Sequence, residues 1–286
     1  MIFTILTVQC VHFNLITIAC NGIIYPMSKG IIQVENLSVH ARFLRSTETI
    51  VEGVSFCLDG GEKLAIVGES GSGKSMIVNA LTSSLADNCF ATGNVEYDGV
   101  NLLENRSFAK KHMGKAIVLI PQGGAESLNP SLKIKTQIYE TLKRNGAKLT
   151  REQKREAAIR NLTKSGLKNA EEILEKYPFE ISGGEAQRVV LAITLCSHAN
   201  LIVADEATRG IDGETKEAFW DCIRNDFSSA AMVFVTHDIA EAKRCDNVLV
   251  LKDGKVAEYG KTLDVFSNPQ SEYTKTLAEA CEVQNA

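Results

Sequence analysis

Residues 68 to 75 read Gly68-Glu69-Ser70-Gly71-Ser72-Gly73-Lys74-Ser75, which completes the pattern Gly-x-x-x-x-Gly-Lys-Ser/Thr. The glycines let the backbone curl so that successive N–H groups point inward, and they remove side chains that would block a phosphate. Lys74 adds a mobile cation for the β- and γ-phosphates, and Ser75 offers a hydroxyl to Mg²⁺. The stretch therefore predicts a binding site for a nucleoside triphosphate.

Both flanks of this loop agree with that prediction. Residues 63–67 form a buried-strand run, and residues 76–81 begin a helix whose N-terminus would face the phosphates. By average residue frequencies, a chance Gly-rich turn of this pattern arises in roughly one chain of this length per hundred. The strand before the loop and the helix after it lower those odds further, so a chance turn is the weaker interpretation.

Length and charge restrict the class of protein. A chain of 286 residues can bury a substantial core and suggests one or two domains. The formal net charge of −4 and the scattered Lys and Arg residues give no general affinity for DNA, so we expect no nucleic-acid partner. The eight cysteines form no CxxC pair and no zinc spacing, which is typical of reduced thiols in the cytosol.

The N-terminal stretch differs from the rest because residues 1–25 contain no Lys, Arg, Asp or Glu. Its length would allow a membrane span, but Gln9 and His12 dilute it, and no basic region precedes it as in a secretion signal. Three interpretations stay open: a start site assigned too early, with Met27 as the true start, a membrane-associated segment, or a disordered extension. Residues 1–26 are therefore an uncertain N-terminal extension.

Strand-type patterns recur along the remaining chain. Short apolar or alternating runs predict strands over residues 31–34, 37–39, 51–58, 116–120, 201–204 and 232–235. The dipeptides Asp98-Gly99 and Asp253-Gly254 predict tight hairpin turns. The first hairpin would span residues 95–100 and the second residues 247–259.

Helical patterns separate these strands. Between residues 134 and 177 we expect a few helices and no strand; Thr150-Arg151-Glu152-Gln153 is a capping box, and Gly166 is placed as a C-terminal cap. A further helix runs through residues 189–195. The alternation predicts an α/β fold, a P-loop NTPase (RecA-like) core with a mainly parallel sheet, an antiparallel β subdomain and an inserted α-helical subdomain.

Two carboxylates follow a predicted buried strand directly. Residues 201–204 are apolar, and Asp205 and Glu206 come next, at the end of a strand where α/β proteins bind ligands. Asp205 suits the Mg²⁺ shell, directly or through water, and Glu206 can polarise an attacking water. An ordinary acidic loop would be the simpler interpretation if the pair stood alone. With Lys74 in the same chain, the pair predicts hydrolysis.

A Ser-Gly-Gly segment gives the second strong signal. Ser182, Gly183 and Gly184 open a predicted helix, whose amides can bind a γ-phosphate; a helix cap without a ligand explains them equally well. Residues 181–188 resemble the LSGGQ signature of ATP-binding cassette (ABC) proteins, with Ile181 for Leu and Glu185 for Gln. The resemblance implies that this segment serves the ATP held by the opposite subunit, and hence a dimer.

Other elements follow in the order of that family. Gln122 resembles the Q-loop glutamine, which implies contact with Mg²⁺ and response to the membrane partner. His237 resembles the switch histidine that contacts the γ-phosphate, although a lone histidine at a strand end is usually structural. Asp212 matches the aspartate of the D-loop and is placed at the nucleotide site. Arg209 and Gly210 depart from the usual D-loop residues, which leaves its contact across the dimer open.

The resemblance covers about residues 30 to 278 and is most specific in two stretches. Residues 122–130 and 266–274 are similar to peptide/nickel importer ATPases, the latter through an F-x-N-P-x-x-x-Y-T pattern. Relatives dedicated to peptides often extend further with a cysteine cluster, whereas Cys281 is the one cysteine near this end, which favours the nickel or metal-chelate branch. Phe43 is the candidate for stacking on adenine, with a core strand position as the alternative.

The resemblance implies an ATP-hydrolysing subunit of a binding-protein-dependent importer for peptides or nickel and other metal chelates. It would lie at the cytoplasmic face of the membrane, with a second ATPase subunit or a copy of itself, two permease subunits and, indirectly, an extracellular substrate-binding protein. A soluble ABC ATPase, or a weakly hydrolysing regulatory cassette, is the alternative. Within an ABC ATPase domain over 27–286, residues 27–130 and 183–265 form the nucleotide-binding core, 131–182 the helical subdomain and 266–286 the C-terminal tail.

Overall fold

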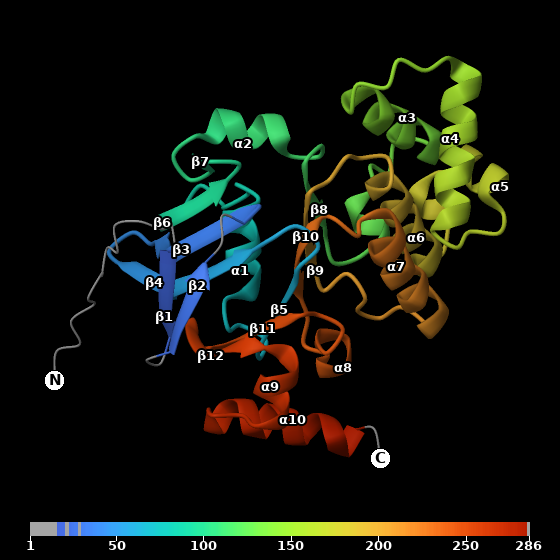
Figure 1. The fold of residues 1–286 in the computed structure, drawn as a ribbon. Coiled ribbons are helices and arrows are strands. Elements are labelled where there is room, and N and C mark those ends of the chain that lie inside the picture. The colour runs from blue at the N-terminus through green and yellow to red at the C-terminus, as the bar shows by residue number, and fades with distance from the viewer. Residues whose placement is uncertain (1–15, 21–22, 28–29, 285–286) are drawn as a thin grey trace, which may run out of the picture.

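One sheet of ten strands organises the chain, in the order β7-β6-β3-β4-β12-β11-β5-β10-β9-β8 (Figure 1). The computed structural model describes residues 16–20, 23–27 and 30–284. The strands of this sheet are β3 (Ile32–Arg42), β4 (Thr47–Leu58), β5 (Lys63–Val67), β6 (Cys89–Tyr97), β7 (Val100–Asn101), β8 (Ile117–Ile120), β9 (Leu201–Asp205), β10 (Ala231–Val235), β11 (Asn247–Lys252) and β12 (Lys255–Lys261). Strands β1 (Ile16–Cys20) and β2 (Ile23–Met27) pair antiparallel with each other. The predicted N-terminal extension lies mostly outside the described residues.

Half of the sheet is parallel, and it carries the Gly-rich loop. Strands β8, β9, β10, β5 and β11 run side by side in the same direction. Alternate residues of β5 enter two different cores, Leu64 and Ile66 on one face and Ala65 and Val67 on the other. Because both faces are buried, these strands need continuous apolar runs, and this explains why they stand out in the sequence.

The other half of the sheet is mostly antiparallel, with one parallel contact where β12 meets β4. Strand β3 pairs with β4 and β6, and β11 pairs with β12. Both predicted hairpin turns are confirmed, since Asp98 and Gly99 have φ values of 51° and 76°, and Asp253 and Gly254 have 47° and 77°. Two successive positive φ angles define the turn type that matches the twist of paired strands.

The structure corrects one strand prediction. The runs 31–34 and 37–39, read as separate in the sequence, belong to the single strand β3. Asn36 adopts a φ of 50°, and the pairing of β3 with β4 shifts between Val34 and Leu37. A β-bulge therefore replaces the expected interruption, because one left-handed residue absorbs the shift without ending the strand.

Helices cover both faces of the sheet, as predicted for an α/β fold. Helix α1 (Lys74–Leu81) packs in the core that includes β3 and β4, whereas α6 (Gly183–Thr194) and α7 (Gly213–Asp226) pack in the other core. The remaining helices outside the inserted subdomain are α2 (Arg106–His112), η1 (Ala125–Ser127), α8 (Ile239–Ala242), α9 (Thr262–Ser267) and α10 (Glu272–Gln284). None of the described helices combines the length and the apolar character needed to cross a membrane.

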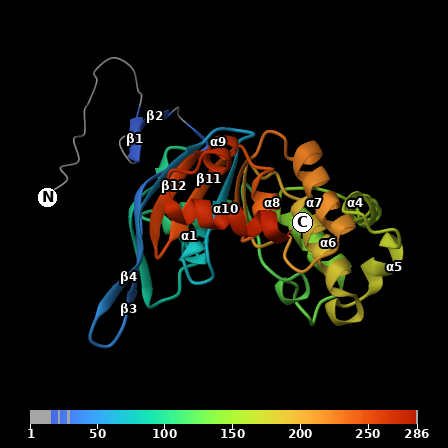
Figure 2. The same cartoon turned by 90° about the horizontal axis from the view of Figure 1, so that it is seen from below.

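The inserted subdomain is helical and projects to one side of the sheet (Figures 1 and 2). It contains α3 (Ile134–Arg144), α4 (Arg151–Lys164), α5 (Ala170–Glu175) and η2 (Pro178–Glu180). As predicted, no strand occurs within residues 134–177, all of which are described. The capping box is confirmed by the hydrogen bonds between Thr150 and Gln153, and Gly166, at φ 90°, follows the end of α4. Helix α6 packs against α3 and α4 as well as β8, which ties this subdomain to the sheet.

Candidate functional site

The Gly-rich loop connects the C-terminal end of β5 to the N-terminus of α1. Close neighbours explain two of its glycines. A Cβ on Gly68 would come within 2.1 Å of the Leu251 carbonyl oxygen, and one on Gly73, at φ 100°, within 2.6 Å of a Val51 methyl group. The loop is thus held closely between β11 and β4, and residues 69–71 are left exposed.

Lys74 provides a buried cation within this loop. Its ammonium group donates hydrogen bonds to the carbonyl oxygens of Gly68, at 2.8 Å, and Glu69, at 2.7 Å. Burial lowers the pKa of Lys74, and the carboxylates of Glu206, Asp205 and Glu69 oppose that shift. The cation therefore lies between the loop backbone and acidic side chains, where it can meet phosphate oxygens.

Two polar atoms beside the loop are buried without a hydrogen-bond partner in the part of the chain that the structure describes: Oγ of Ser72 and Oδ1 of Asp205. Burial raises the pKa of Asp205, while a hydrogen bond with Ser75 and the charge of Lys74 lower it. A buried carboxylate oxygen with a free acceptor position, next to a serine hydroxyl, fits the oxygen ligands that Mg²⁺ prefers. The structure thus brings together Ser75 and Asp205 as the sequence predicted.

Glu206 and His237 meet at the C-terminal ends of β9 and β10. Glu206 has a φ of 47°, and its N–H donates a hydrogen bond to the Val235 carbonyl at 2.9 Å. Its Oε1 lies 3.6 Å from Nδ1 of His237. Left-handed backbone is strained in residues other than glycine and concentrates at functional sites. Here it accompanies a mostly buried carboxylate next to an exposed imidazole, which are the predicted catalytic pair.

Gln122 lies at the same edge of the sheet. It follows β8, which is parallel to β9, and β9 is parallel to β10. The C-terminal ends of these strands therefore share one edge, the usual ligand edge of such sheets. The side chain of Gln122 is exposed. Its neighbourhood agrees with the predicted site, and its role toward Mg²⁺ stays a prediction.

The Ser-Gly-Gly segment begins α6, as predicted. Ser182 caps this helix: its Oγ accepts the N–H of Glu185 at 3.3 Å, and the Glu185 carboxylate accepts the Ser182 N–H at 2.9 Å. The N–H of Ser182 and its hydroxyl both donate to the Glu185 carboxylate and lower its pKa. A glutamate carboxylate can accept hydrogen bonds from Ser182. The replacement of the usual Gln by Glu185 therefore still allows a capping box at the start of α6. Ser182 and Gly183 are exposed, and α6 lies apart from α1 in both Figures 1 and 2.

Asp212 and Phe43 are two further predicted site residues, and the described part of the structure shows no contact that tests their predicted roles. Asp212 caps α7, since its carboxylate oxygens accept the N–H and the hydroxyl of Thr215 at 2.9 and 2.8 Å. Its predicted contact with nucleotide stays a prediction. Phe43 is 54% exposed beyond the end of β3, so the core-strand alternative is wrong. An exposed ring remains compatible with adenine stacking, which is also untested.

Sequence reasoning missed two contacts at this site. Arg209 donates a hydrogen bond to Oε2 of Glu206 at 2.6 Å. Tyr273 accepts a hydrogen bond from the N–H of Glu69, across 204 positions of the chain. The sequence did show that Arg209 differs from the usual D-loop residue and that Tyr273 lies in the F-x-N-P-x-x-x-Y-T pattern. Neither observation indicates which residue the side chain contacts.

Comparisons with known proteins agree with this geometry. Residues 51–209 match the protein-family model described as ABC transporter. The chain is 35% identical over 236 residues to the metal-staphylopine import system ATP-binding protein CntD of Staphylococcus aureus, covering 80% of this chain and 86% of that protein. It is 34% identical over 261 residues to the dipeptide transport ATP-binding protein DppD of Caldanaerobacter subterraneus subsp. tengcongensis, with 90% and 80% covered. A solved dimeric bacterial ABC transporter cassette shows a TM-score of 0.71 at 25% identity, covering 81% of this chain and 98% of that chain.

Proposed function

Because the chain belongs to the ABC transporter family and is an ATPase, we propose that it powers a binding-protein-dependent importer for peptides or metal chelates. The observation that best supports ATP hydrolysis is that Lys74, Asp205 and Glu206 lie close together at one edge of the sheet. The names of the relatives, one in metal-staphylopine import and one in dipeptide transport, support the substrate class.

The proposed chemistry uses the loop and the two strand ends. The loop amides and Lys74 bind the β- and γ-phosphates, and Glu206 accepts a hydrogen bond from the attacking water so that the water is oriented toward the γ-phosphorus. His237, beside Glu206, contacts the γ-phosphate. Ser75 and Asp205 would hold Mg²⁺, with Gln122 nearby. When bound, Mg²⁺ supplies positive charge to the phosphate oxygens.

We infer that each nucleotide is shared between two subunits. Ser182 and Gly183 are exposed at the start of α6, and that helix lies apart from the loop of the same chain. An exposed helix N-terminus can donate N–H groups to a phosphate held by a neighbour. The likeness to a solved dimeric cassette supports this arrangement. The partner would be a second copy or a second ATPase subunit.

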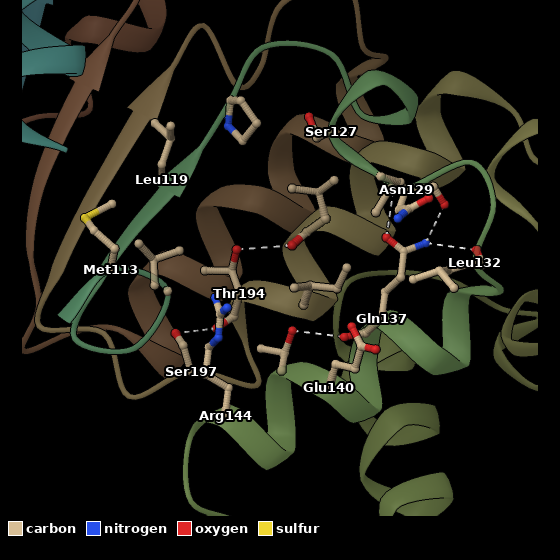
Figure 3. A pocket seen from close by; sticks show the side chains of 17 residues that line it. Met113, Leu119, Ser127, Asn129, Leu132, Gln137, Glu140, Arg144, Thr194 and Ser197 are labelled. Atoms are coloured by element: carbon tan, nitrogen blue, oxygen red, sulfur yellow. Dashed lines mark hydrogen bonds between the residues drawn. The ribbon is translucent and has the colours of Figure 1, made fainter. Parts of the chain in front are cut away.

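A groove of about 490 Å³ is the proposed contact with a permease subunit. It lies between β8, α3 and α6 (Figure 3). Gln137 of α3 holds one side of it, since its amide donates to the carbonyl oxygens of Asn129, at 3.1 Å, and Leu132, at 3.0 Å. Pro121 also lines it and precedes Gln122 directly. A segment seated here could therefore transmit its position to the nucleotide edge.

A charge reversal tests that contact. Glu140 is exposed on α3 and lines the groove, whereas Glu156 is exposed on α4 away from it. Glu140→Arg should reduce co-purification with the permeases and remove their stimulation of ATP hydrolysis, while Glu156→Arg should leave both intact. ATP binding by the isolated subunit should be unchanged in both variants. Equal permease recovery from the two variants would exclude this groove.

Transport itself tests the importer proposal. The chain would be assembled with its permeases and binding protein in vesicles, and uptake of a dipeptide and of a nickel chelate would be compared. ATP-dependent uptake of one of them, lost in Glu206→Gln, is the expected result. ATPase activity that never responds to permeases or binding protein would favour the soluble alternative. The contact of Arg209 with Glu206 favours the remaining alternative, a weakly hydrolysing cassette beside an active partner.

A further inference from the structure

Tyr273 contacts the Gly-rich loop from the C-terminal segment. It lies in the first turn of α10, and its hydroxyl oxygen accepts a hydrogen bond from the N–H of Glu69 at 3.0 Å. Helix α10 lies beside α8, α9 and β12 in both views (Figures 1 and 2). The C-terminal segment thus reaches the loop from the side of α8, α9 and β12.

Glu69 links this tyrosine to the cation of the loop. Its N–H donates to Tyr273, and its carbonyl oxygen accepts a hydrogen bond from Lys74 at 2.7 Å. One exposed residue therefore contacts two side chains, Lys74 five positions later in the same loop and Tyr273 204 positions later in the C-terminal segment. A displacement of Tyr273 would shift an acceptor that determines where the ammonium group of Lys74 lies.

Tyr273 is itself held in a defined position. Lys252 lies with Nζ 5.0 Å from the centre of the Tyr273 ring, and the ring packs against the hydrophobic core. The buried carboxylate of Glu258 accepts the backbone N–H groups of Gln270, at 3.0 Å, and Ser271, at 3.1 Å. A buried carboxylate with two backbone donors fixes the chain just before α10. The backbone before Tyr273 and its ring are therefore both held where the hydroxyl meets Glu69.

We propose that Tyr273 is a positioning residue for nucleotide binding, which holds Glu69 and, through it, Lys74 in the geometry that receives the triphosphate. This inference rests on the proposed role of the loop as the phosphate site. It assigns the C-terminal tail a function in nucleotide affinity in addition to any contact with other subunits. Burial raises the pKa of Tyr273, so the phenol stays neutral around pH 7.

The variant Tyr273→Phe tests this inference because it removes the hydroxyl and keeps the ring with its packing and its contact with Lys252. The Kd for ATP and the KM should both rise about three- to tenfold, the effect of one hydrogen bond, while kcat stays the same. Tyr139→Phe is the matched control, since Tyr139 is partly buried in α3, in the inserted subdomain. It should bind ATP like the parent protein.

Hydrogen exchange supplies a readout that a purely structural role would not produce. Without nucleotide, the Glu69 amide should exchange faster in Tyr273→Phe, whereas the buried amides of α1 and β5 and the melting temperature should not change. Parent-like ATP affinity together with parent-like exchange would overturn the inference. A lower melting temperature without a change in affinity would overturn it as well, because the hydroxyl would then only stabilise the fold.

Lys74→Ala in the same binding assay separates this inference from the proposed site. If Lys74→Ala loses ATP and Tyr273→Phe binds it normally, the loop is the phosphate site and Tyr273 has no positioning role. If both variants bind ATP normally, the assignment of the loop itself is wrong.

Discussion

Arg209 and Glu206 form a hydrogen-bonded ion pair in which the guanidinium Nη1 lies 2.6 Å from Oε2 of the carboxylate. The same carboxylate is the proposed acceptor for the attacking water. An oxygen that accepts a hydrogen bond from a cation is a weaker acceptor for a second donor. Arg209 therefore restrains the proposed catalytic group in the free subunit, and the closing of two subunits around ATP would have to release it.

We expect Arg209→Ser to raise basal ATP hydrolysis. Because a partly exposed ion pair is worth about 0.2–1 kcal/mol, the increase should be about two- to fivefold. Steady-state phosphate release measures it, at a protein concentration high enough for two subunits to meet. Arg224→Ser is the matched control, since Arg224 forms an exposed pair with Asp221 at the same spacing and the same 2.6 Å. A slower Arg209→Ser enzyme would mean that the arginine supports Glu206 rather than restraining it.

Glu206→Gln should keep ATP binding and nearly abolish turnover. The amide has the same shape but no longer attracts a proton from water, and loss of one such group costs about 10²–10⁴-fold in rate. Lys74 and the loop amides are unchanged, so the Kd for ATP should remain close to that of the parent protein. Glu104→Gln, at an exposed position before α2, controls for the lost charge. Parent-like hydrolysis by the assembled Glu206→Gln transporter would refute the assignment.

Lys74→Ala should weaken ATP binding itself. The substitution removes the ammonium group that lies within the loop and leaves the carbonyl oxygens of Gly68 and Glu69 without that donor. Fluorescence or filter-binding titration with ATP measures the loss. Lys110→Ala, at an exposed position in α2, should bind like the parent protein. Equal affinity of the two variants would contradict the role of Lys74.

The predictable part of the site is the part built from neighbouring residues. The loop, its strand and its helix are contiguous, and Gly68 and Gly73 stand where a side chain would collide with β11 or β4. Residues 68 to 75 therefore predict both geometry and ligand. Asp205 and Glu206 are predictable for the same reason. A buried parallel strand appears in the sequence as an apolar run, and the residues that follow it lie at the ligand edge of the sheet.

The contacts that were missed depend on geometry that no local pattern encodes. Arg209 contacts Glu206 at a point where Glu206 adopts a left-handed backbone conformation, which is unusual outside glycine and which no sequence pattern indicates. Tyr273 reaches Glu69 only after the sheet and the C-terminal segment have packed. In β3, one left-handed residue, Asn36, joined two runs that the sequence showed as separate. The contacts that the sequence does not predict therefore depend on long-range packing or on a single unusual backbone angle.

Ser182→Arg should block turnover and leave ATP binding at the loop of the same chain largely intact. A guanidinium at the exposed start of α6 would fill the position proposed for the γ-phosphate of the neighbouring subunit, whereas Lys74 and its loop lie elsewhere in the chain. The substitution also removes a helix cap, which costs about 1 kcal/mol of stability. Thr150→Arg removes the equivalent cap of α4 and controls for that loss. In the assembled transporter, Thr150→Arg should hydrolyse ATP nearly normally and Ser182→Arg should not. Full-rate hydrolysis by a dilute, demonstrably monomeric protein would refute the shared site, because a lone subunit would then complete its own chemistry without Ser182 from a partner.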